Sequence, residues 1–234
     1  MTAHRPTVTD SDAASVHLLE VLSAAARGEL PLRDGVHVIG APGGAVDAVV
    51  AFPFHSIVAT SLPSEEVHDR LDPDDPAASL RATFLAWLAE RLATTSGSID
   101  VVLACPDAAA LPAPKSLPVQ IERRDDLVVH PRVERAMDYR RDVVVAADER
   151  LRAIACAGRG LGDRWEISFE LDESLRANGH GAALALAAAT LAPPGEPVFA
   201  QVAPANTTSL RTMLAAGFTP IGAEALFLRR RDGG

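Results

Sequence analysis

The chain contains few cysteines and few aromatic residues. Two of its 234 residues are Cys, and 4% are Phe, Trp or Tyr. Two cysteines are too few for the disulfide framework of a small secreted domain. Cys105 and Cys156 each lie in an apolar run, which favours buried free thiols over a pair. Neither has a partner at metal-ligand spacing, so we expect no metal centre. With so few aromatics, the core must consist mainly of small side chains.

The chain also lacks long hydrophobic runs and an excess of positive charge. No apolar run reaches the ~18 residues of a membrane-spanning helix, and residues 1–12 carry no signal-peptide pattern. The net charge is -9, from 22 basic and 31 acidic residues, and such a surface repels nucleic acid and anionic membranes. We therefore expect a cytoplasmic protein that binds neither nucleic acid nor membrane. A hydrophobic fraction of 48% is ample for a folded core.

Strand-like and helix-like segments alternate along the chain, which predicts an α/β fold with mixed sheets. Prolines 106, 112, 114 and 118 punctuate an alanine-rich segment and predict a domain boundary there. We expect an N-terminal domain over residues 1–112 and a C-terminal domain over 118–234. Both halves show the order strand, strand, loop, helix, strand, so an internal duplication is a hypothesis. In the first half, a helix is predicted over 77–92, with Asp75 as its N-cap.

The second half contains a predicted meander of strands over 143–147, 151–157 and 164–171. In its last strand Phe169 and Leu171 face one side, whereas Glu166 and Glu170 face the other. A glycine-bearing turn then precedes a helix-like run over 183–191. The turn consists of Arg176, Ala177, Asn178, Gly179, His180, Gly181 and Ala182. Backbone N–H groups in such a turn bind phosphate at the helix N-terminus, and glycines allow close approach. The alternative is an ordinary strand-to-helix turn.

Three linked features resemble the GCN5-related N-acetyltransferases (the GNAT superfamily). They are the strand that ends at Phe169-Glu170-Leu171, the R-x-x-G-x-G turn, and an Asn206-x-x-Ser209 segment followed by Gly217-Phe218. The resemblance implies the acyl-CoA N-acyltransferase fold, in two similar halves, with acetyl-CoA as cosubstrate.

The resemblance also assigns residues to the cosubstrate. The backbone of Phe169 and Leu171 would pair with the pantetheine arm, and the amides from Asn178 to Ala182 would hold the pyrophosphate. For Arg176, a charge contribution and simple solvation are both open, and His180 is expected to be exposed and without a role. Asn206 caps the helix that follows it and can also contact the cosubstrate. The matching segment of the first half, residues 72–75, lacks glycine and is acidic, so we expect only the second half to bind coenzyme A.

The implied reaction transfers an acetyl group from acetyl-CoA to a primary amine, on a small molecule or a peptide, by direct attack. Glu166 and Glu170 are the candidate bases, although both could be solvated carboxylates. The family's strands would separate after Leu171 to admit the cosubstrate. Met213 stands where many members carry a tyrosine acid, so the general acid is unidentified. This gap favours the alternative of a non-catalytic acyl-CoA-binding or regulatory protein. The acceptor, the acyl group and the oligomeric state, a homodimer included, are left open.

Overall fold

The computed structural model describes residues 10–43, 46–111, 116–176 and 179–228. The chain divides into two compact units. The first unit comprises the described residues of Met1–Ala24, Leu30–Ile99 and Gly222–Gly234, and the second comprises those of Ala25–Glu29 and Asp100–Ile221. Both units combine helices with parallel and antiparallel strand pairs, so the predicted mixed α/β fold is confirmed.

The first unit contains strands in the order β1-β3-β2-β10. Strands β1 (Gly35–Gly40) and β3 (His55–Thr60) are parallel, and β2 (Val46–Phe52) runs antiparallel to both β3 and β10 (Thr219–Leu228). Three helices accompany the strands: α1 (Asp10–Ala26), α2 (Ser64–His68) and α3 (Ala82–Arg91). Apolar residues of α3 such as Phe84 and Leu88 pack against Val49, Val58 and Phe227 of the sheet.

The second unit contains strands in the order β4-β9-β8-β7-β6-β5. Strand β4 spans Thr95–Cys105, β5 Glu122–Arg123, β6 Arg141–Ala147, β7 Ala153–Arg159, β8 Trp165–Leu171 and β9 Val198–Val202. All neighbouring pairs are antiparallel except β8 and β9, which are parallel. The second unit therefore has one parallel junction within an otherwise antiparallel sheet.

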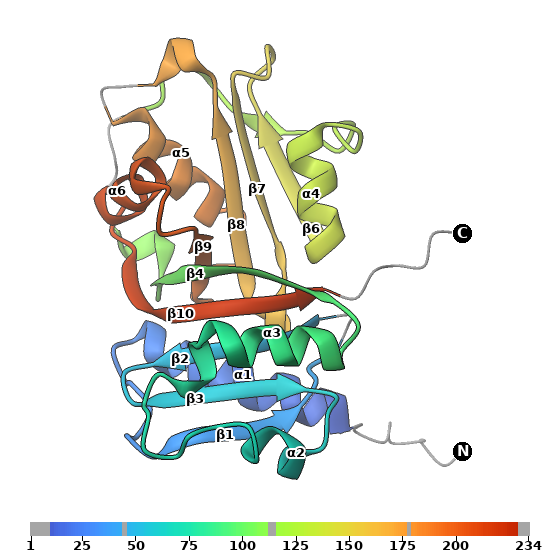
Figure 1. Ribbon diagram of the computed structural model, residues 1–234. Helices are drawn as coiled ribbons and strands as arrows, with labels where there is room; N and C mark the ends of the chain where they lie inside the picture. The colour runs from blue at the N-terminus through green and yellow to red at the C-terminus, as the bar shows by residue number, and fades with distance from the viewer. Residues whose placement is uncertain (1–9, 44–45, 112–115, 177–178, 229–234) are drawn as a thin grey trace, which may run out of the picture. The chain divides into compact units, whose positions relative to one another are not determined.

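Helices cover both faces of this second sheet (Figure 1). Helices α5 (His180–Ala189) and α6 (Thr207–Ala215) pack on one face, where alternate residues of β7 and β8 form a core with them. Helix α4 (Pro131–Tyr139) packs on the other face, against Ile154 and Cys156. Cys105 and Cys156 are both buried and free, as predicted, and burial raises the pKa of each thiol.

The helix predicted over 77–92 begins later than expected. A short 3-10 turn occupies Ala78–Leu80, and α3 starts at Ala82 after an extended residue, Arg81. Asp75 does not cap α3; its carboxylate accepts the N–H of Ala77 at 3.0 Å and pairs with Arg81. The buried hydroxyl of Ser79 donates to Ser56 at 2.8 Å. This side-chain bond ties the 3-10 turn to β3, a tertiary contact that helical periodicity does not report.

The first compact unit continues to Ile99 and includes the described residues from Gly222 onward, and the described residues of 106–118 fall within the second unit. The predicted domains, residues 1–112 and 118–234, stay a prediction. The hypothesis of two duplicated halves stays a prediction. Within the described ranges, no helix has both the length and the apolar character that a membrane crossing needs.

Candidate functional site

Strands β8 and β9 separate within the second unit. Their parallel pairing consists of Trp165 opposite Val198 and Glu166 opposite Phe199. On its other side, β9 pairs with β4 through all five of its residues. The separation therefore starts after Glu166, earlier than the predicted point after Leu171. Most of β8, from Ile167 to Leu171, therefore does not pair with β9.

The phase of the β7–β8 ladder shows where the backbone groups of β8 point. The N–H of Gly160 donates to Arg164 O at 2.9 Å, and the N–H of Asp172 donates to Arg152 O at 2.7 Å. In an antiparallel ladder hydrogen-bonded residues alternate, so the even-numbered residues of β8 bond to β7. The N–H and C=O groups of Phe169 and Leu171 therefore point to the edge from which β9 has diverged.

A turn connects this edge to the N-terminus of α5. Gly179 is the N-cap residue of α5 and has a φ of 84°, a left-handed conformation that favours glycine. No side chain of the described residues caps α5 at this end. The first N–H groups of a ten-residue helix thus lie at the end of the turn, where an anion binds most readily. Ala177 and Asn178 lie outside the described residues.

Two side chains near the start of α5 contact backbone carbonyls of preceding residues. Arg176 donates from Nε to the carbonyl of Leu171 at 3.0 Å, and its Nη1 lies 3.3 Å from the carboxylate of Glu173. His180 Nδ1 lies 3.0 Å from the carbonyl of Leu175. His180 is partly buried, so the expectation of an exposed side chain is wrong, while its expected lack of a role stays a prediction.

The other predicted positions in this region have packing contacts. A Cβ at Gly181 would lie 3.1 Å from Cγ2 of Thr212, so the glycine permits close approach of α5 and α6. Ala182 is buried in the same core. Asn206 caps α6 by accepting the N–H of Ser209 at 3.1 Å, which confirms the capping interpretation. Met213 is 1% exposed and cannot donate a proton to a thiolate.

Glu166 lies in a buried ionic network on the α4 face of the sheet. Its carboxylate is 2.9 Å from Nε of Arg164 and 3.1 Å from Nε of Arg140, and it accepts the N–H of Leu161 at 3.2 Å. Burial alone would raise the pKa of Glu166, but Arg164 and Arg140 outweigh it and hold the pKa below its usual range. A carboxylate in this state is a weak proton acceptor, so Glu166 is the poorer of the two candidate bases.

Gly160 makes room for this carboxylate. A Cβ at Gly160 would lie 2.2 Å from Cδ of Glu166, whose oxygens are fixed by the two arginines. We expect Gly160→Ala to lower the free energy of unfolding by about 1–3 kcal/mol, because the network must shift to admit a methyl group. Denaturant unfolding measures this. Gly40→Ala is the control, since its Cβ would meet only Ala14 at 3.9 Å, and an equal loss in both variants would contradict the expectation.

Glu170 is exposed at the other end of the same strand face. Its carboxylate lies 3.2 Å from Nε of Arg132, a residue in the first turn of α4. Its side chain is 49% exposed, against 6% for Glu166. Of the two predicted carboxylates, Glu170 is therefore the one that water or an amine can reach.

Helix α4 supplies two arginines that the sequence analysis missed. Arg132 pairs with Glu170, and Arg140, which ends α4, contacts Glu166, the hydroxyl of Ser168 at 3.0 Å and the carbonyl of Ile167 at 3.3 Å. The sequence signal that could have indicated the start of α4 was His130-Pro131. Pro131 is the first helical residue, and His130 accepts the N–H of Arg132.

No family model matches the sequence, and no curated protein matches it. Solved structures do resemble it. A GCN5-related N-acetyltransferase from Kribbella flavida matches 64% of this chain and 64% of its own, with 18% identity and a TM-score of 0.42. One from Sphaerobacter thermophilus matches 63% and 56%, with 17% identity and a TM-score of 0.41. A tandem GNAT protein from the clavulanic acid biosynthesis pathway matches 79% and 63%, with 15% identity and a TM-score of 0.41. The chain spans less than two thirds of the length of these three structures.

Proposed function

We propose that the second unit is an acyl-CoA-dependent N-acyltransferase that moves an acetyl group from acetyl-CoA to a primary amine. The observation that carries the proposal is the backbone edge of β8 at Phe169 and Leu171, which leads through a turn to the N-terminus of α5 at Gly179. An extended strand edge binds the amides of a linear ligand, and a helix N-terminus binds phosphate. Coenzyme A joins these two chemical features in one molecule.

Each residue then has a defined task. Acetyl-CoA supplies the acyl group as a thioester. The backbone of Phe169 and the N–H of Leu171 align the pantetheine arm, because the carbonyl of Leu171 already accepts a hydrogen bond from Arg176. The first amides of α5 hold the pyrophosphate. The amine attacks the carbonyl carbon, so that a C–N bond replaces the C–S bond, and Glu170 takes up the proton that the nitrogen loses. The thiolate leaves without an acid, which its pKa of about 8.5 permits.

A second candidate is a non-catalytic protein that binds acyl-CoA and performs no transfer. Two observations favour it: Met213 is buried in the core, and Glu166 is neutralised by Arg140 and Arg164. Both candidates require acyl-CoA binding, and only the first requires turnover with an amine. Calorimetry and an amine-dependent assay for released thiol therefore distinguish them.

A charge at position 179 tests the binding site that both candidates share. Aspartate tolerates the left-handed conformation better than most residues and suits a helix N-terminus, so Gly179→Asp keeps α5 intact. Its carboxylate would repel the pyrophosphate, and we expect the affinity for acetyl-CoA to fall by about tenfold or more. Gly179→Asn, equal in size and uncharged, is the matched control and keeps most of the affinity. If native protein shows no binding in calorimetry, the proposal fails.

A further inference from the structure

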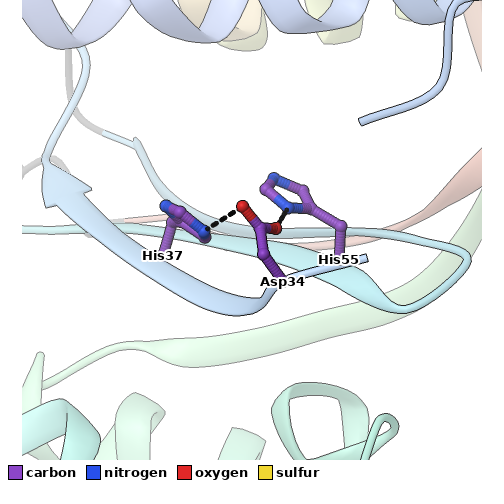
Figure 2. Close-up of side chains that lie close together, drawn as sticks. All are labelled: Asp34, His37 and His55. Atoms are coloured by element: carbon purple, nitrogen blue, oxygen red, sulfur yellow. Dashed lines mark hydrogen bonds and ion pairs between the residues drawn. The ribbon is translucent and has the colours of Figure 1, made fainter. Parts of the chain in front are cut away.

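Two histidines and one carboxylate meet in the first unit, whereas the residues assigned to acyl transfer belong to the second. Asp34 Oδ1 lies 2.6 Å from Nδ1 of His55, and Asp34 Oδ2 lies 3.1 Å from Nε2 of His37 (Figure 2). The two imidazole rings are 4.8 Å apart between centroids. Three potential ligand atoms, one from each residue, all lie within 4.8 Å of one another. Both imidazoles direct a nitrogen at the same carboxylate.

The parallel pairing of β1 with β3 creates this cluster. Gly35 is opposite His55 and His37 is opposite Ile57, so His37 and His55 project from the same face of the pair, two residues out of register. The backbone N–H of Gly35 donates to Phe54 O at 3.3 Å, and Gly35 has a φ of 90°. This turn at the start of β1 places Asp34 beside both histidines. The strand pairing therefore fixes the positions of His37 and His55, and Asp34 follows from the turn that precedes β1.

The donor set matches a late first-row divalent ion. Imidazole nitrogen with carboxylate oxygen suits zinc, copper and nickel, whereas magnesium and calcium prefer oxygen alone. Metal-ligand bonds of about 2.0–2.2 Å place neighbouring donors about 3.2–3.5 Å apart in a tetrahedral site. The 2.6 Å separation between His55 and Oδ1 of Asp34 needs to open by about 0.6–0.9 Å, and the 3.1 Å separation between His37 and Oδ2 is close to the required distance. The widest of the three donor separations, up to 4.8 Å, needs to close by about 1.3–1.6 Å, so that one carboxylate oxygen and both nitrogens reach the same ion. The side chains of Asp34 and His37 are about half exposed and can make this movement, while His55 is 8% exposed and anchored in β3.

The electrostatics also favour a cation. Both ion pairs recorded for Asp34 go to these histidines, and the chain carries a net charge of -9. A divalent ion can replace the hydrogen atoms that now join the two imidazoles to Asp34.

We propose that Asp34, His37 and His55 bind one zinc-class divalent ion through two imidazole nitrogens and one carboxylate oxygen, with a remaining position open to water. The sequence analysis expected no metal centre because neither cysteine has a partner at metal-ligand spacing, whereas Asp34, His37 and His55 meet through the β1–β3 register. Three protein ligands with an open position are the arrangement of zinc sites that bind and activate water.

Metal titration of the full-length protein tests this proposal. After treatment with EDTA and dialysis, calorimetry with ZnCl2 is expected to show one ion per chain, and MgCl2 is expected to give no heat. Since His37 is partly exposed, His37→Ala should fold normally in far-UV circular dichroism and yet bind zinc at least about tenfold more weakly. Asp34→Asn, which keeps a hydrogen-bond acceptor, should show a similar loss.

His68→Ala is the matched control, because His68 is an exposed histidine of α2 whose Nδ1 contacts only Ser64 among the described bonds. It should retain the native zinc affinity. Zinc should also raise the thermal midpoint of the native protein and of His68→Ala, but not that of His37→Ala. An absence of zinc binding to native protein, or an unchanged affinity in His37→Ala, overturns the proposal. Neither result bears on acetyl-CoA binding, which is measured separately.

Discussion

Replacing Arg164 by methionine is expected to lower the free energy of unfolding by about 3–5 kcal/mol. The Arg164 side chain is fully buried, and it pairs with Glu166, which is 6% exposed. Methionine fills similar space but leaves the carboxylate with one guanidinium, Arg140, in a region that water does not reach. Charges buried without sufficient partners are among the costliest defects in a folded protein. Denaturant unfolding of native and variant protein measures the difference.

Arg141→Met is the matched control for this variant. Arg141 also pairs with an acidic residue, Asp163, but its side chain is 68% exposed. Exposed pairs contribute about 0–1 kcal/mol, so the control should unfold almost as the native protein does. Equal stability losses in the Arg141 and Arg164 variants would show that the burial of the network is unimportant.

The same network predicts how stability depends on pH. The pKa of Glu166 is lower in the folded state than its ordinary value of 4.5. The folded state therefore holds the ionised form more strongly, and this contribution is complete above the ordinary carboxyl pKa. It is lost as pH falls through the lowered folded value. Glu166→Gln should accordingly flatten the acid limb of the stability profile, with Glu149→Gln, an exposed carboxylate in a turn, as the comparison.

The sequence predicted the strand well because local rules govern it, but α5 begins at His180 and not at residue 183 as predicted, so the last three residues of the predicted turn belong to the helix. Gly179 is a glycine since the N-cap residue of α5 has a positive φ, and β8 shows the expected alternation with Phe169 and Leu171 on one face. The alternation also placed Glu166 and Glu170 together on the opposite face. It could not distinguish them, because their difference lies in what packs above each one. That information comes from Arg140 and Arg164, whose positions depend on the tertiary fold.

The arginines at α4 and the histidines of β1 and β3 also could not be assigned from sequence patterns. Helix α4 has only two buried residues, Val133 and Ala136, so its hydrophobic periodicity is too sparse to read. His37 and His55 lie on strands that both seemed ordinary, and only the parallel register makes them neighbours. Sequence patterns describe a residue's own element. The residues with charge or ligand chemistry in this protein depend on which elements become adjacent.

Replacing Glu170 by glutamine is expected to lower kcat for acetyl transfer by about 100-fold or more, if Glu170 accepts the proton of the attacking amine. Glutamine keeps the size and the hydrogen-bonding capacity of the side chain but cannot take up a proton. The backbone edge and the α5 N-terminus are unchanged, so calorimetry should give the native affinity for acetyl-CoA. The assay follows thiol release over a panel of primary amines, and kcat/KM is measured across pH.

A control makes this result specific. Glu149→Gln, which changes an exposed carboxylate in the β6–β7 turn, should retain native turnover. Turnover that survives in Glu170→Gln at the native level removes the base assignment. If native protein binds acetyl-CoA and releases no thiol with any amine, the buried Met213 and the neutralised Glu166 take on a different meaning. They then indicate a protein that binds acyl-CoA but lacks the groups needed for acyl transfer.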